Sequence, residues 1–216
     1  MKPPWLIACD GAHESLKMTN RPESENVQSF ERRSSTYEDS LFQGLFFDRI
    51  HRIALNSIPA EINPESIMDI GCGTGRLLRK AAIRWPTARL IGVDPAEGMV
   101  KEARRLTIGA QFYVSSAESL PLPDESVDLV MSTVSFHHWR DQVQALKQVA
   151  RVLHPGGIFV LADILWPYGL QKIIRHGRLV NSTILSEMFA LSGLNIQLQR
   201  RRMSRFLLVT IGKREN

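Results

Sequence analysis

A glycine-rich turn between an apolar run and a helical pattern constrains this chain more than any other feature. Residues 67–76 read Ile-Met-Asp-Ile-Gly-Cys-Gly-Thr-Gly-Arg, and residues 77–82 continue with the apolar spacing of a helix. Glycine is needed where a backbone bends sharply and approaches a ligand without a Cβ in the way. The stretch therefore predicts a buried strand, a ligand-binding turn and the start of a helix.

A second apolar run, residues 90–93, ends in Asp94 about 20 residues after the first, the usual place for an acid that binds a ribose. A dinucleotide fingerprint of the form G-x-G-x-x-G would need a third glycine at position 76, where Arg76 stands. The glycines fall at 71, 73 and 75 instead. This spacing disfavours a nicotinamide-type cofactor and favours an adenosyl ligand without a pyrophosphate.

Strand-like and helix-like segments alternate through the middle of the chain. Near-continuous apolar strands separated by helices indicate a parallel sheet covered on both faces, so the expected fold class is α/β and doubly wound. A helix at 182–192 and two final strands at 195–203 and 206–212 follow. The other expected strands are 66–70, 89–93, 111–114, 127–132 and 157–162, and the other expected helices are 38–57, 75–85, 96–106 and 141–153.

Several further motifs follow the glycine turn in a fixed order. Residues 95–99 read P-A-E-G-M, residues 115–130 read S-S-A-E-S-L-P-L-P-D-E-S-V-D-L-V, and residues 135–139 and 151–157 read S-F-H-H-W and R-V-L-H-P-G-G. Together they resemble the class I S-adenosylmethionine-dependent methyltransferases, in particular the small methyltransferase type 11 group. The resemblance extends over residues 37–212.

This resemblance implies a mostly parallel, seven-stranded Rossmann-like sheet whose last strand is antiparallel. It also implies S-adenosylmethionine as cofactor and S-adenosylhomocysteine as product. Asp94 is expected to bind the ribose diol, and Asp69 either the cofactor's ammonium or its own loop. Where the family commonly has an aspartate for the adenine amino group, this chain has Ser116. The other residues expected to bind cofactor are Gly71, Cys72, Gly73, Gly75, Pro95, Met99, Ala117 and Glu118.

The expected activity is transfer of a methyl group to an oxygen, nitrogen or carbon of a small-molecule substrate. Positioning of the reactants can supply about 7–11 kcal/mol of such a barrier, whereas a general base adds about 10²–10⁴-fold. The candidate catalytic bases are His137 and His138, which follow the fourth strand. Alternatively, these histidines only satisfy loop backbone before a helix that Asp141 caps. No cluster in the sequence has metal-ligand spacing.

The formal net charge is +5, and the residues from 195 to the end account for all of it. One interpretation is an edge hairpin whose arginines prevent pairing with other chains. The alternative is a face that binds an anionic substrate or nucleic acid. The nucleic-acid case is an RNA methyltransferase that uses this basic hairpin. It is disfavoured, because the stretch after the fourth strand, Ser132 to Phe136, lacks the [DNS]-P-P-[YFW] motif of enzymes that methylate base nitrogens. A third interpretation is that the chain is a non-catalytic partner protein that binds the cofactor.

At 216 residues the chain suits one domain, expected at 37–216 after a flexible arm at 1–36. The apolar runs are shorter than the roughly 18 to 20 residues of a membrane span. With two cysteines, a cytoplasmic location is expected. Translation starts at Met1 or Met18, the protein is a monomer or homodimer, and residues 163–181 form at most a modest substrate cap.

Overall fold

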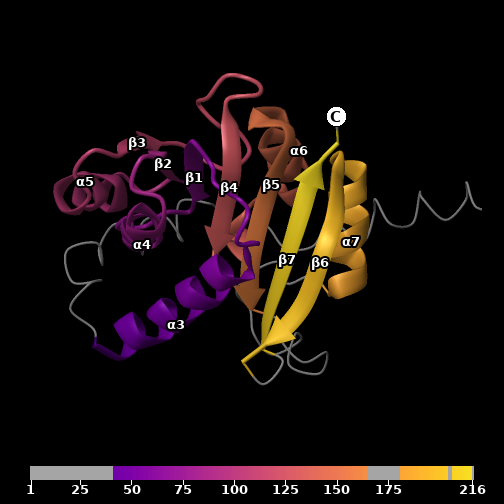
Figure 1. The fold of residues 1–216 in the computed structure, drawn as a ribbon, viewed down its shortest axis with the longest axis horizontal. Coiled ribbons are helices and arrows are strands. Elements are labelled where there is room, and N and C mark those ends of the chain that lie inside the picture. The colour runs from indigo at the N-terminus through magenta and orange to yellow at the C-terminus, as the bar shows by residue number, and fades with distance from the viewer. Residues whose placement is uncertain (1–40, 165–180, 204–205, 216) are drawn as a thin grey trace, which may run out of the picture.

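The computed structural model describes residues 41–164, 181–203 and 206–215, and it contains one seven-stranded sheet within them (Figure 1). The strand order is β3-β2-β1-β4-β5-β7-β6. Strands β1 to β5 are parallel, β7 is antiparallel to both neighbours, and β6 therefore runs with the first five. The bounds are β1 (Ser66–Ile70), β2 (Arg89–Asp94), β3 (Gln111–Val114), β4 (Val127–Thr133), β5 (Leu153–Ile164), β6 (Leu194–Arg202) and β7 (Leu207–Arg214).

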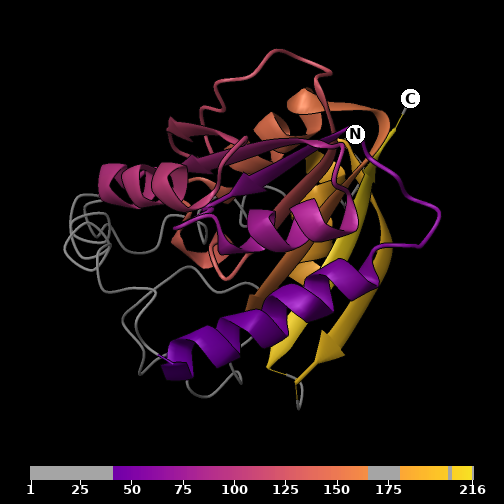
Figure 2. The ribbon, with the colours of Figure 1, turned by 60° about the vertical axis from the view of Figure 1, so that its left-hand side comes forward.

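Helices cover both faces of the sheet, as the alternating sequence pattern predicted (Figure 2). Helices α3 (Leu41–Ser57), α4 (Arg76–Arg84) and α5 (Glu97–Leu106) pack on one face, and α6 (Gln142–Val152) and α7 (Ser182–Leu191) pack on the other. All five residues of β1 are buried, because this strand has neighbours on both sides and helices on both faces. Each large aliphatic side chain so buried contributes about 1.5–3 kcal/mol. The doubly wound class with an antiparallel last strand is confirmed.

The boundaries differ from the predicted ones where local patterns were ambiguous. Strand β5 begins at Leu153 rather than 157, so the H-P-G-G segment belongs to the strand. In the predicted helix at 38–57, residues 38–40 lie outside the described part of the chain. Its apolar stripe is also only half buried: Ile50 and Ala54 are fully buried, whereas Leu45 is 74% exposed. The expected arm at 1–36 and most of the expected cap at 163–181 likewise lie outside the described residues.

Two helices on the second face begin at side-chain caps. Asp141 accepts a hydrogen bond from the Gln144 N–H at 2.9 Å, which confirms the predicted start of α6. Asn181 accepts from the Ile184 N–H at 2.9 Å in the same way before α7. Such caps satisfy one of the free N–H groups of a first helical turn and are worth about 1 kcal/mol.

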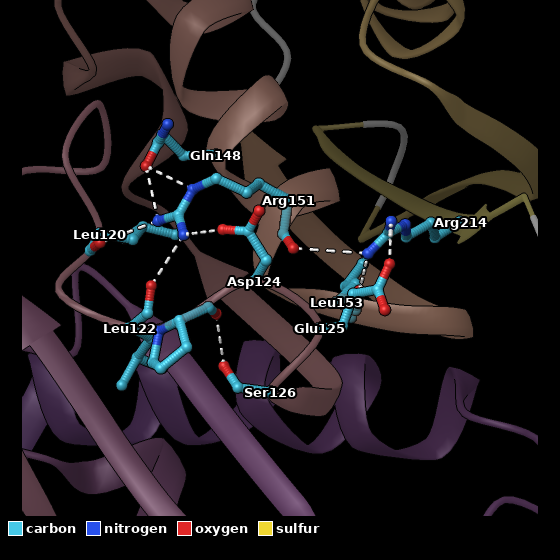
Figure 3. A network of polar contacts seen from close by, with 10 residues as sticks. Leu120, Leu122, Asp124, Glu125, Ser126, Gln148, Arg151, Leu153 and Arg214 are labelled. Atoms are coloured by element: carbon cyan, nitrogen blue, oxygen red, sulfur yellow. Dashed lines mark hydrogen bonds and ion pairs between the residues drawn. The ribbon is translucent and has the colours of Figure 1, made fainter.

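The long connection between β3 and β4 is held in place by Arg151 of α6 (Figure 3). Its guanidinium donates to the carbonyls of Leu122 at 2.8 Å and Leu120 at 3.0 Å, and it pairs with Asp124 at 2.7 Å. Arg214 of β7 pairs with Glu125 in the same connection at 2.7 Å. The motif at residues 115–130 thus supplies structural anchors as well as candidate ligand contacts.

Within the described ranges, no helix combines the length and the apolar character that crossing a membrane requires.

Candidate functional site

The carboxyl ends of the parallel strands gather most of the predicted site residues at one edge of the sheet. Strands β1 and β2 lead into α4 and α5 on one face, whereas β4 leads toward α6 on the other. The chain therefore leaves the adjacent strands β1 and β4 in opposite directions, and ligands of open α/β sheets bind at such a switch point. The glycine turn follows β1, and a short 3-10 helix, η2 (Phe136–His138), follows β4.

The three glycines of the turn have different physical roles. All three have positive φ values, at 71°, 50° and 80° for Gly71, Gly73 and Gly75. A Cβ on Gly71 would lie 2.0 Å from Oγ of Ser135, so this glycine lets the β4–η2 loop pack against the turn. A Cβ on Gly75 would lie 2.8 Å from Oγ1 of Thr107. By contrast, a Cβ on Gly73 would meet nothing within 4 Å, so open space lies beside this residue.

Asp94, at the end of β2, ties its strand to the glycine turn. Its Oδ2 accepts the Gly73 N–H at 2.9 Å, and its Oδ1 accepts the Ala96 N–H at 2.9 Å. An ionised carboxylate has about four acceptor positions, which is the chemistry that binding a ribose diol requires. The side chain is largely buried and beside the open space at Gly73.

Asp69, the acid of the first apolar run, is buried at the end of β1. Among the described residues nothing donates a hydrogen bond to its Oδ1. Burial raises the pKa of Asp69 well above its ordinary value, and the nearby Asp94 carboxylate raises it further. A buried carboxylate without a donor is costly. A positively charged or proton-donating group of a ligand would therefore be stabilised beside Oδ1 of Asp69.

The remaining residues predicted to bind cofactor surround the turn unevenly. Ser116 and Glu118 are half-buried beyond β3, and Glu118 Oε1 already accepts the N–H groups of Arg140 and Asp141, at 2.7 and 3.1 Å. Of the other residues in this group, Pro95 is exposed, whereas Cys72, Met99 and Ala117 are buried. Burial raises the pKa of the Cys72 thiol, so this group stays protonated and packs as a small apolar side chain.

His137 is held by a carboxylate that comes from the neighbouring strand. Its Nδ1 lies 2.8 Å from Oδ1 of Asp163, the penultimate residue of β5, and its backbone N–H donates to Oδ2 at 3.0 Å. Burial lowers the pKa of His137, but the charge of Asp163 and its hydrogen bond outweigh that effect, so the pKa is raised above 6.5. The pair fixes the ring and leaves Nε2 as the nitrogen that can exchange a proton.

His138 differs from His137 in its surroundings. It is exposed, and its ring centroid lies 4.0 Å from that of His137. The two predicted histidines are thus together, but the carboxylate contact belongs to His137.

Asp163 and Ser135 were missed in the sequence. Asp163 directly follows an apolar run in the sequence, as Asp94 does, which is a signal that could have identified it. Ser135 gives no such signal, because its contacts with Gly71 and with the Trp139 Nε1–H, at 3.0 Å, depend on how the chain folds.

Comparison with known proteins bears on this arrangement. Residues 68–161, which run from within β1 to within β5 and include the glycine turn, Asp94 and His137, match the family model of a methyltransferase domain. The chain belongs to the class I methyltransferases. The strand order and the antiparallel β7 agree with this family, and membership implies S-adenosylmethionine as the cofactor.

The names of the relatives of this methyltransferase indicate different substrates. A malonyl-[acyl-carrier protein] O-methyltransferase of Dechloromonas aromatica is 33% identical over 149 residues, which are 68% of this chain and 54% of that protein. A 27-O-demethylrifamycin SV methyltransferase of Amycolatopsis mediterranei is 34% identical over 134 residues, or 56% of this chain and 48% of that protein. The chain thus spans about half the length of these curated relatives.

A solved structure supports the fold of this methyltransferase independently. It is a chain of the complex between the Haloferax volcanii Trm112 methyltransferase activator and a methyltransferase. The TM-score is 0.73 at 24% identity, covering 87% of this chain and 98% of that one.

The residues at the carboxyl edge fit the cofactor that the family implies. The ammonium of S-adenosylmethionine can supply the donor that buried Asp69 lacks, directly or through water. The open space at Gly73 leaves room for a ligand against the backbone, and the Asp94 carboxylate beside it is the kind of acceptor that binds a ribose diol.

Proposed function

We propose that this methyltransferase transfers a methyl group from S-adenosylmethionine to an oxygen atom of a small molecule, with His137 as the general base. The observation that carries the proposal is the contact of His137 Nδ1 with Asp163 at 2.8 Å, at the carboxyl ends of adjacent strands. Two relatives with O-methylated acceptors in their names support an oxygen nucleophile.

The proposed roles of the residues follow from their chemistry. When bound, the cofactor supplies a methyl group on a positively charged sulfur, which makes the carbon electrophilic. Asp94 would hold the ribose and Asp69 the ammonium end, with the glycine turn against the methionine part. His137 would accept the hydroxyl proton at Nε2, and Asp163 would stabilise the imidazolium that results. Because Asp163 raises the pKa of His137 above its ordinary value, Nε2 is a stronger base than that of an unpaired histidine.

A carboxylate acceptor is a second candidate, favoured by the name of the Dechloromonas aromatica relative. A carboxylate is already deprotonated at neutral pH and needs no base. In that case His137 would carry its proton and attract the acceptor's charge. The two candidates therefore differ in the protonation state of His137 that supports turnover.

The test uses purified protein, cofactor labelled with tritium in the methyl group, and a cell extract separated into small molecules, RNA and protein. We expect label in the small-molecule fraction. Loss of the base costs about 10²–10⁴-fold, so His137→Ala should lower the labelling rate by at least about 100-fold. The control is His154→Ala, since His154 is exposed in β5 outside the site.

The other outcomes distinguish the alternatives. Unaltered turnover in His137→Ala would show that His137 is not the general base. Rates that fall with rising pH would favour the carboxylate acceptor. Label confined to RNA, and reduced steeply by salt, would replace the small-molecule acceptor with nucleic acid. Cofactor binding without label in any fraction would indicate a non-catalytic partner protein.

A further inference from the structure

We propose that the carboxyl end of β6 binds a phosphate or diphosphate group of the methyl acceptor through Arg201, with Arg200 and Arg202 adding positive charge beside it. This inference rests on the proposed function, because it names the class of acceptor for the same site. It assigns to these arginines a binding role beyond protection of the sheet edge.

The topology brings the three arginines to the side of the sheet formed by the carboxyl ends of the parallel strands, where the candidate site lies. Strand β7 is antiparallel to both β5 and β6, so β6 runs in the same direction as β5. Figure 1 shows β4, β5 and β6 pointing the same way and β7 pointing back. The last three residues of β6 therefore lie at the edge that carries the glycine turn, Asp94 and the His137–Asp163 pair.

The strand register fixes how far the backbone of Arg201 lies from that of Asp163, the partner of the candidate base. Asp163 pairs with Leu208 of β7, and Leu208 pairs with Arg201 of β6. Two strand spacings separate Asp163 from Arg201, which is about 10 Å at about 4.8 Å per spacing. Residues paired in this way project to the same face of a sheet, so Arg201 shares the face of Asp163. The backbone of Arg201 thus lies within reach of an acceptor that is held beside Asp163 and His137.

The charges of these arginines are left uncompensated by the described residues. All three side chains are exposed, and no carboxylate of the described chain forms an ion pair with any of them. Arg214 on the neighbouring strand, by contrast, pairs with Glu125. Guanidinium groups bind phosphate oxygens in bidentate fashion, so Arg201 suits an anionic group on the face of Asp163. Arg200 and Arg202 project to the other face and add positive charge at the same end of the strand.

Two other uses of the arginines predict different behaviour. Single-stranded nucleic acid is usually bound by basic residues interleaved with aromatic rings for stacking, and the run at 200–202 has none. Protection of the free edge of β6 needs charge of any kind, so lysines would serve as well as arginines. Phosphate recognition depends on the guanidinium fork, which lysine lacks.

The first experiment measures binding of inorganic pyrophosphate by titration calorimetry at low salt. The variants are Arg200→Gln/Arg201→Gln/Arg202→Gln and the same positions changed to Lys. The matched control removes three exposed cations from three helices, as Arg52→Gln/Lys101→Gln/Lys147→Gln. We expect the Gln variant to bind at least tenfold more weakly than wild type, the Lys variant to be intermediate, and the control to match wild type. Cofactor affinity should be equal in all four, which verifies folding.

The second experiment identifies the acceptor class. Small molecules of a cell extract are divided on an anion-exchange column, and each pool is offered with labelled cofactor. We expect label in the retained pool. At a low concentration of that pool, the labelling rate of the Gln variant should be at least tenfold lower than that of wild type or the control.

The results separate this inference from the proposed function. If wild type does not bind pyrophosphate, or the Gln variant or the control contradicts the expected order, the arginine site is wrong, whatever the labelling shows. Label only in the unretained pool, or only in RNA, overturns the phosphate-bearing acceptor while methyl transfer stands. If pyrophosphate binds as expected but no fraction is labelled, the arginine site is supported and the proposed methyl transfer is contradicted.

Discussion

Both carboxylate oxygens of Asp163 contact His137, one at the ring nitrogen Nδ1 and the other at the backbone N–H, at 2.8 and 3.0 Å. A single acid at the end of β5 thus fixes the position of the loop after β4 and the orientation of the ring on it. The contact couples the geometry of the candidate base to its basicity.

We expect Asp163→Asn to lower kcat by about 10- to 100-fold, a smaller effect than loss of the base itself, with little change in the acceptor KM. The amide removes the charge that raises the pKa of His137, so burial then lowers that pKa. The neutral ring is the active form, and kcat therefore rises with pH through the pKa of His137. The acid limb of the pH–kcat profile should shift to lower pH in the variant. A purely structural role for Asp163 would leave the limb in place.

Gly73 and Gly109 form a matched pair that tests where the cofactor lies. Both have positive φ, at 50° and 84°, and both have open space where a Cβ would stand. Alanine at either position should lower the free energy of unfolding by about 1–2 kcal/mol, because left-handed backbone disfavours a Cβ. Only Gly73→Ala should weaken cofactor binding, by at least tenfold in calorimetry. Equal affinity in the two variants would place the ligand elsewhere.

Asp94→Ala should likewise weaken cofactor binding at least tenfold. The variant loses the proposed ribose acceptor and also the hydrogen bond that holds the Gly73 N–H. Asp128→Ala is the control, because Asp128 binds Ser66 and the Glu65 N–H at the opposite edge of the sheet. That control should lose stability and keep its affinity for cofactor. Unchanged affinity in Asp94→Ala would mean that the ribose is held by other groups.

His51 of α3 should make the protein acid-sensitive. Burial, followed by the charge of Lys80, lowers the pKa of this histidine to about 4 from 6.5. The unfolded chain binds the proton more readily, so His51 contributes stability fully above pH 6.5 and loses it as the pH falls toward 4. The shift corresponds to about 3 kcal/mol. Urea unfolding at pH 7 and pH 4.5 should show a smaller pH dependence in His51→Leu than in wild type, whereas His154→Gln should match wild type.

Arg151→Leu should lower the free energy of unfolding by about 2–4 kcal/mol, because the connection between β3 and β4 loses three contacts to one charged group. Arg105→Leu, on the exposed surface of α5, removes only a pair with Glu102 and should leave the stability nearly unchanged, because solvent screens an exposed ion pair. Similar losses in the two variants would show that Arg151 is not an anchor.

The strength of the sequence signal decided which parts of the fold could be predicted. Asp94 ends an apolar run that is too short and too β-branched for a helix, so strand β2 and its terminal acid were readable. Asp141 before the helical pattern of α6 was equally clear, since capping is a local interaction. Local signals of this kind depend on neighbours within a few residues.

Contacts between distant segments could not be predicted from local sequence patterns. Asp163 was visible as a residue, but its pairing with His137 depends on the adjacency of β4 and β5 and on their register. The exposure of Leu45 on α3 could not be read either, because helical periodicity shows which residues share a stripe and not how far the stripe is covered. The placement of Arg201 relative to Asp163 required the direction of β7.

The reversed direction of β7 has a practical consequence. This strand starts at the edge where the candidate site lies and ends with Arg214 at the opposite edge, so chain that continues past it emerges away from the glycine turn. A fluorescent reporter, affinity handle or surface tether joined after the last residue would then leave the mouth of the site accessible to ligands.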